Sequence, residues 1–96
     1  MAVYTIIATV ALPGLAADVA REYPEHHAWS DRAWAVRTDD TAQTVAGKLG
    51  VSGRDAAGNA ASKYGHIVVM QATSNYWGFG PTPFWDWLKS AFERGS

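Results

Sequence analysis

YTIIATVALPG, residues Tyr4–Gly14, is a run of apolar and β-branched residues that stops at a Pro-Gly pair. β-branched and aromatic residues favour a strand, and Pro13-Gly14 breaks one. We therefore predict a strand from Val3 to Ala11. One face of this strand carries only apolar side chains, and the other mixes Val and Ile with Thr. We expect helices to cover the first face and only partial cover on the second.

The chain of 96 residues is long enough for a single domain with one hydrophobic core. Its net charge is −1, from eight basic and nine acidic residues that form no run, so bulk attraction to nucleic acid is not indicated. The absence of cysteine excludes disulfides and cysteine metal sites, and it suits a reducing compartment. No apolar run approaches the ~20 residues of a membrane span. We expect a cytoplasmic protein without a membrane contact.

Two helices are predicted in the first half of the chain. The first spans Leu15–Tyr23 and ends at Pro24, with Asp18 on the side away from its apolar stripe. The second follows the N-cap residues of Thr38–Thr41 and runs to about Leu49. Gly50, the next residue, is well placed as the C-cap of this helix.

Three further strands and one long loop complete the middle of the chain. Glu25–Trp29 and Arg32–Arg37 are predicted to form a hairpin around the Ser30-Asp31 turn, and His66–Ala72 is a strand with apolar residues on both faces. Residues 50–65 are rich in small residues and show no clear period. We interpret them as a flexible insertion loop, because long loops in compact domains are usually functional or mobile.

A third helix is predicted to begin at Thr82-Pro83, since Thr is a good N-cap and Pro fits the first helical position. The resulting order is β-α-β-β-α-β-α over residues 1–96, which is the ferredoxin-like α+β pattern with an added C-terminal helix. Such an antiparallel sheet carries two helices on one face. Val3 and Ile7 would lie on the open face, which either the third helix or a second subunit must cover.

Short motifs along this framework resemble the SinR-like proteins, small relatives of the CRISPR-associated adaptation nucleases. They are Tyr4-Thr-Ile in the first strand, Leu12-Pro-Gly14 after it, Ala33-Trp-Ala-Val36 with Thr38 in the hairpin, and Trp87-Leu-Lys89 in the last helix. The resemblance covers most of the chain except residues 50–65. It implies a cytoplasmic, ferredoxin-like protein that forms a homodimer.

The nuclease relatives imply an Asp at the end of the first strand, where two carboxylates paired across the dimer can hold a divalent cation. The matching residue here is Thr9, and no acid occurs in residues 1–17. A neutral hydroxyl does not replace a carboxylate as a ligand for a hard cation. We therefore expect no catalytic residue, no metal and no cofactor in this chain.

The densest polar cluster is the hairpin with its two adjacent histidines. A possible polar site there comprises His26, His27, Asp31 and Arg37. Neighbouring residues of a strand point to opposite faces, so one metal ion is not expected to bind both His26 and His27. We interpret these residues mainly as exposed polar groups of the hairpin.

Five tryptophans in a chain this short point to aromatic packing at a contact surface. The predicted partner or dimer surface consists of Tyr76, Trp77, Phe79, Trp85, Trp87 and Phe92. Aromatic side chains can also stack on nucleic-acid bases, but such platforms usually come with a basic groove, and Lys89 is the basic residue near this set.

The sequence therefore favours a non-enzymatic homodimer that binds a macromolecular partner, with a protein partner preferred over nucleic acid. One alternative is a divalent-metal-dependent nuclease that uses other acids, such as Asp31 or Asp39. Another is a small-ligand or nucleotide-binding domain closed by the loop 50–65.

Overall fold

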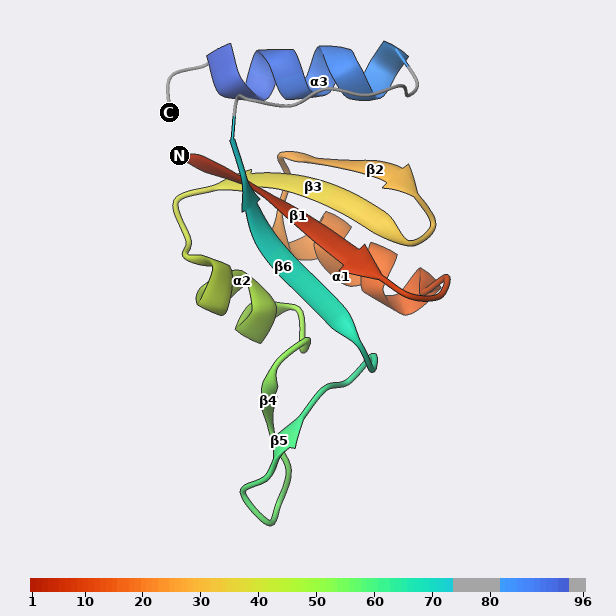
Figure 1. Cartoon of the computed structure of the whole chain (residues 1–96), viewed down its shortest axis with the longest axis vertical. Helices are drawn as coiled ribbons and strands as arrows, with labels where there is room; N and C mark the ends of the chain where they lie inside the picture. The colour runs from red at the N-terminus through yellow and green to blue at the C-terminus, as the bar shows by residue number, and fades with distance from the viewer. Residues whose placement is uncertain (74–81, 94–96) are drawn as a thin grey trace.

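The computed structural model describes residues 1–73 and 82–93 (Figure 1). The elements in chain order are β1 (Ala2–Ala8), α1 (Pro13–Glu22), β2 (His26–Ser30), β3 (Ala33–Thr38), α2 (Ala42–Lys48), β4 (Gly53–Arg54), β5 (Ala60–Ala61), β6 (Ile67–Ala72) and α3 (Thr82–Glu93). Four strands form an antiparallel sheet in the order β2-β3-β1-β6, and β4 pairs with β5 separately. The predicted α+β class is confirmed. No helix in the described ranges is long and apolar enough to cross a membrane.

Strand β1 lies inside the sheet, and its centre pairs on both sides. Ile6 stands opposite Trp34 of β3 and opposite Val69 of β6. The predicted apolar face of β1 meets α1 and α2, as expected. The main core formed there buries Tyr4, Ile6, Ala8, Leu15, Val19, Tyr23, Trp34, Val36, Val45, Leu49 and Val51.

The first strand ends at Ala8, so the predicted extension to Ala11 was wrong. The cause lies in the neighbouring strands. The N–H of Ala8 donates to the carbonyl of Arg32 at 2.8 Å, and Ala8 pairs with Ile67, the first residue of β6. Beyond this point neither neighbour continues the ladder. Pro13 then occupies the start of α1, where its missing N–H is not needed.

The predicted start and end of the second helix are confirmed by its caps. The hydroxyl of Thr41 accepts a hydrogen bond from the N–H of Thr44 at 3.2 Å and caps α2. Gly50 follows the helix with a φ of 71°, a conformation that favours glycine. The hairpin of β2 and β3 is likewise confirmed, with His26 opposite Val36 and a register shift between Ala28 and Ser30.

Residues 50–65, which we interpret as a flexible insertion loop, contain a short hairpin of β4 and β5. Strands β4 and β5 have two residues each, which is too short for any periodicity in the sequence to show. The carboxylate of Asp55 accepts hydrogen bonds from the N–H groups of Ala57 and Asn59 at 2.9 and 3.0 Å and organises the turn. The hairpin projects from the end of the molecule opposite α3 (Figure 1). Its flexibility stays a prediction.

Candidate functional site

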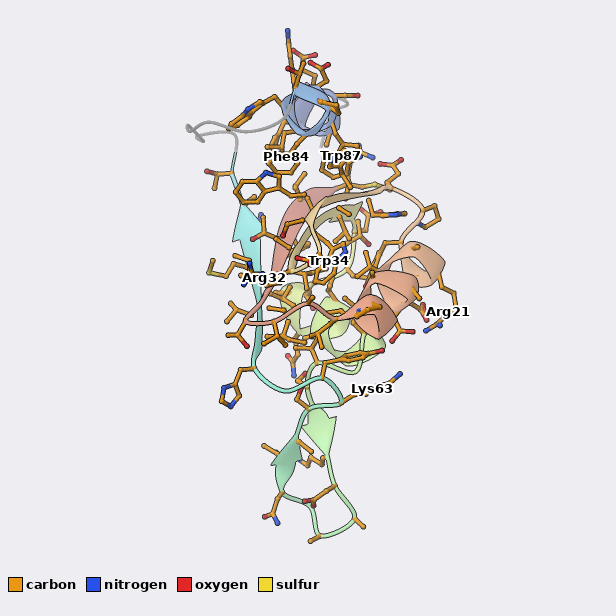
Figure 2. All side chains as sticks on the ribbon, turned by 90° about the vertical axis from the view of Figure 1, so that its right-hand side faces the viewer. Arg21, Arg32, Trp34, Lys63, Phe84 and Trp87 are labelled. Carbon is orange, nitrogen blue, oxygen red and sulfur yellow. The ribbon has the colours of Figure 1, made fainter. Side chains whose placement is uncertain are left out.

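The sheet face opposite α1 and α2 is only partly covered. Helix α3 packs across one end of it through Phe84, Leu88 and Ala91, which bury Val3 and Ala35. Phe84 and Trp87 point from the helix toward the sheet (Figure 2). The spacing i, i+3, i+4, i+7 predicts an apolar stripe of Phe84, Trp87, Leu88 and Ala91 on this helix, and the second core confirms it. The third helix covers the Val3 end of the open face and leaves the Ile7 end exposed.

The remaining part of this face carries exposed apolar side chains, which we call the apolar patch: Ile7, Trp29, Val68 and Met70. Each of these residues is between 44% and 52% exposed. Ile7 stands directly opposite Val68, and Met70 stands opposite Thr5 on the same side of the sheet. The patch is therefore continuous across β1 and β6. Contiguous apolar surface of this kind marks interaction sites more often than isolated exposed residues do.

Trp29 connects the patch to α3. Its ring stacks on Phe84 with centroids 5.2 Å apart and planes within 9°. A small cavity of about 80 Å³ lies beside this stack and is bordered by Ile7 and Ala33. A second cavity of about 160 Å³ lies between Ala72 and the helix, next to Leu88. Both cavities are almost wholly apolar, so the patch is hollowed where the helix meets the sheet.

The six predicted aromatic contact residues divide into two groups. Tyr76, Trp77 and Phe79 lie outside the described residues. Trp85, Trp87 and Phe92 are partly buried and pack against the second core under α3. Trp87 also approaches His27, with ring centroids 6.2 Å apart. The structure therefore uses these three rings to attach α3 to the sheet. Trp29, which was not among the predicted contact residues, is half exposed on this face.

The residues of the predicted polar site do not lie together in the structure. His26 lies within 2.7 Å of the Tyr23 carbonyl through Nδ1, while His27 packs against Phe84 on the other face. The expectation that the two histidines diverge is thus confirmed. Asp31 is exposed at the hairpin turn, 3.7 Å from Arg32. These groups do not converge on one point, so they do not form a shared catalytic or ligand site.

Arg37 has a different role from the one predicted, because it holds α3 against the sheet. Its Nε donates to the carbonyl of Ala91 at 3.2 Å, and its Nη1 donates to Glu25 at 3.0 Å. The side chain is only 9% exposed. Since Arg37 stands opposite Val3 in the ladder, the same residue links β3, the N-terminal strand and the last helix.

Thr9 is exposed and follows directly after β1. Within residues 1–73 and 82–93 no cluster of three or more His, Asp or Glu side chains could hold a metal ion. The groove lined by Tyr23, Asp40 and Lys48 also contains paired charges. Asp40 accepts hydrogen bonds from Lys48 at 2.9 Å and from the Tyr23 hydroxyl at 3.0 Å. Burial and the neighbouring Asp40 raise the pKa of Tyr23, so its hydroxyl stays protonated at neutral pH.

One polar cluster was missed by sequence reasoning. Asp18 was expected on the outer side of its helix, but it is buried, and this prediction was wrong. The hydroxyl of Tyr64 donates to its carboxylate, and Arg21 and Lys63 lie 2.7 and 3.3 Å from it. An ideal Cβ on Gly14 would lie 3.3 Å from the Tyr64 ring, so a glycine permits this approach. Asp18 and Tyr64 are 46 positions apart, and no pattern in the sequence predicts their contact.

The Tyr64 hydrogen bond, together with Arg21 and Lys63, holds the pKa of Asp18 below its ordinary value despite burial. A carboxylate with a lowered folded-state pKa stabilises the fold above the unfolded pKa of about 4, and this contribution is lost as the pH falls through the lower folded value. We expect Asp18→Asn to lose about 2 kcal/mol of unfolding free energy at neutral pH and less in acid. Urea unfolding at both pH values measures this.

The exposed Asp31 provides the matched control, because Asp31→Asn removes a carboxylate at a solvated turn. It is expected to change the unfolding free energy by less than about 0.5 kcal/mol. An equal loss for Asp18→Asn at neutral and acidic pH would contradict the electrostatic explanation and leave only altered packing.

Comparison of the chain with protein-family models, with curated proteins and with solved structures finds no match. Of the surfaces described, the apolar patch beside α3 is the one whose exposure calls for an explanation.

Proposed function

We propose that this protein is a non-enzymatic interaction module of ferredoxin-like fold, related to the SinR-like proteins, that acts in the cytoplasm as a homodimer and binds a protein partner. The proposed fold is supported by the sheet order β2-β3-β1-β6 and by the placement of α1 and α2 on one face. The proposed relationship is supported by the short motifs of β1, the hairpin and α3.

The single observation that carries the proposed function is the apolar patch. Ile7, Val68 and Met70 stand about half exposed on strands of a folded sheet, beside an exposed Trp29. Tryptophan is enriched among the residues that dominate binding energy at interfaces. A partner that covers the patch removes this apolar area from water, and the cavities beside Phe84 can receive its side chains.

Charge favours a protein partner over nucleic acid. The four patch residues are uncharged, whereas affinity for a phosphate backbone depends on Lys and Arg contacts. Arg21 and Arg32 lie within 4 Å of acidic side chains, which offset their charge. A protein surface with an apolar centre and a polar rim fits this face better.

The polar groups described above support the proposal that the protein is not an enzyme. Thr9 supplies no carboxylate at the position that matters in the nuclease relatives. Lys48 and the Tyr23 hydroxyl hold Asp40, and Arg21, Lys63 and the Tyr64 hydroxyl hold Asp18. Both carboxylates therefore have structural partners.

The proposal predicts that Ile7→Lys weakens partner binding at least tenfold. A lysine at the centre of the patch must be desolvated in any apolar interface, at a cost of more than about 1.4 kcal/mol, which corresponds to tenfold in affinity. The partner is identified by quantitative capture on the wild-type protein, and its affinity for both variants is then measured by calorimetry.

Ala17→Lys is the control, because Ala17 is exposed on α1, on the opposite side of the sheet. It is expected to bind the partner like the wild type. Equal affinity of wild type and Ile7→Lys would overturn the proposal, as would selective retention of nucleic acid in place of a protein.

A further inference from the structure

Strand β6 forms one edge of the sheet, and its sequence offers no protection against pairing. It has six residues, Ile67–Ala72, none of which is charged or Pro. Its register with β1 runs without interruption from Val3 opposite Ala72 to Ala8 opposite Ile67. Natural edge strands are usually blunted by lysines, prolines, bulges or a covering element. Within the described residues β6 carries no lysine, proline or bulge, and helix α2 contacts one of its faces without pairing with its edge.

The hydrogen-bond pattern shows which main-chain groups of β6 point outward. The N–H of Ala8 donates to Arg32, so Ala8 and Ile6 direct their main-chain groups toward β3. In an antiparallel ladder the direction alternates along the strand, so Thr5 and Ile7 direct theirs toward β6. Their partners, Met70 and Val68, face back toward β1. Val69 and Gln71 therefore present their N–H and C=O groups to the open edge.

The other edge of the same sheet is protected. β2 follows Pro24 and Glu25, and its ladder with β3 is interrupted between Ala28 and Ser30. The contrast between the two edges within one sheet indicates that the open edge of β6 has a use.

We propose that two copies of this chain pair through β6, antiparallel and about a two-fold axis, so that two four-stranded sheets join into one. The inference rests on the proposed interaction function and specifies its dimer contact. An antiparallel edge strand is complementary to itself, and a symmetric pair uses the same patch on both subunits. Because β6 carries no charge, identical strands meet without like-charge repulsion. A second copy therefore satisfies every outward main-chain group on both sides.

This pairing has a consequence for the apolar patch. Val68 and Met70 belong to the paired strand, and Ile7 lies one strand away. The two patches of a dimer thus lie side by side on one face of the joined sheet. The dimer thus has a partner-binding surface twice as large, with one α3 at each end. The dimer contact uses main-chain atoms at the sheet edge, whereas the partner contact uses side chains on the sheet face.

The test compares Gln71→Pro with Gln71→Thr by sedimentation equilibrium. Gln71 is exposed and its N–H faces the edge, so the proline removes an outward donor, spares the ladder with β1 and places its ring against the partner strand. We expect the proline variant to weaken dimerisation at least tenfold and the threonine variant to dimerise like the wild type. Circular dichroism checks that both variants keep their fold.

Amide hydrogen exchange of the wild-type protein provides a readout that needs no variant. The N–H groups of Val69 and Gln71 are expected to become protected as the protein concentration rises into the dimer range. A wild type that stays monomeric at millimolar concentration, fast exchange of both amides in the dimer, or a Gln71→Pro dimer of unchanged affinity would each overturn the inference. If the proline variant unfolds, the exchange result alone decides.

The dimer contact through β6 and the partner-binding function can be disproved independently of each other. If β6 does not pair but Ile7→Lys still abolishes partner binding, the edge contact is wrong and the partner-binding function stands. If β6 pairs but Ile7→Lys binds the partner like the wild type, the dimer contact stands and the partner-binding function is wrong.

Discussion

Trp34→Ala is expected to lower the free energy of unfolding by about 4 kcal/mol. Deleting a buried tryptophan side chain usually costs about 3–5 kcal/mol. Trp34 is 2% exposed, stands opposite Ile6 in the ladder and belongs to the core under α1 and α2. A domain of this size has about 5–15 kcal/mol of stability in total, so the variant approaches the limit of folding. Urea titration followed by circular dichroism measures the loss, which corresponds to a fall in Tm of about 20 °C.

Trp29→Ala is the matched control, since it removes the same side chain from the neighbouring strand. Trp29 is half exposed and its described ring contact is the stack on Phe84. Its loss should reduce the unfolding free energy by about 1 kcal/mol, the value of an aromatic pair. Similar losses for Trp29→Ala and Trp34→Ala would contradict the assignment of the main core to the α1 and α2 face.

Phe84→Ala is expected to detach α3 while the main core stays folded. Phe84 is 8% exposed and packs with Val3, Ala35, Leu88 and the ring of Trp29. Deleting a buried phenylalanine costs about 3 kcal/mol or more, and the second core is small enough for that loss to fall on helix docking. Amide exchange of α3 should accelerate about a hundredfold, the change that corresponds to about 3 kcal/mol.

Asp86→Ala controls for an effect on helix formation alone. Asp86 is exposed on α3, and alanine is the better helix former, so the docked helix should persist with unchanged exchange rates. Equal acceleration in α3 and in the central strand β1 after Phe84→Ala would show that the helix and the main core unfold together, and would contradict the division into two cores.

Detachment of α3 also connects to the proposed interface. Val3 and Ala35 are buried by the helix, and they share a sheet face with Ile7. Without α3 the apolar patch would extend to the end of the sheet. The helix, fastened by Phe84 and by the hydrogen bond from Arg37 to Ala91, sets the limit of the surface that a partner can cover.

The sequence by itself determined the type and order of the main elements. Alternating apolar residues around Ile6 specify a strand, because side chains of a strand alternate between faces. Thr41 and Gly50 specify the two ends of α2, because a hydroxyl caps orphan N–H groups and glycine tolerates positive φ. The spacing of Phe84, Leu88 and Ala91 specifies the buried stripe of α3. These are local properties, which neighbouring residues are enough to decide.

Only the tertiary structure decided what depends on contacts between distant segments. The end of β1 at Ala8 depends on where β3 and β6 stop, and the burial of Asp18 depends on Tyr64, far away in the chain. The extent of the open face depends on how far α3 reaches, which leaves Val3 covered and Ile7 exposed. A strand pattern records which residues share a face, but it does not record what packs on that face or which strand lies at the edge.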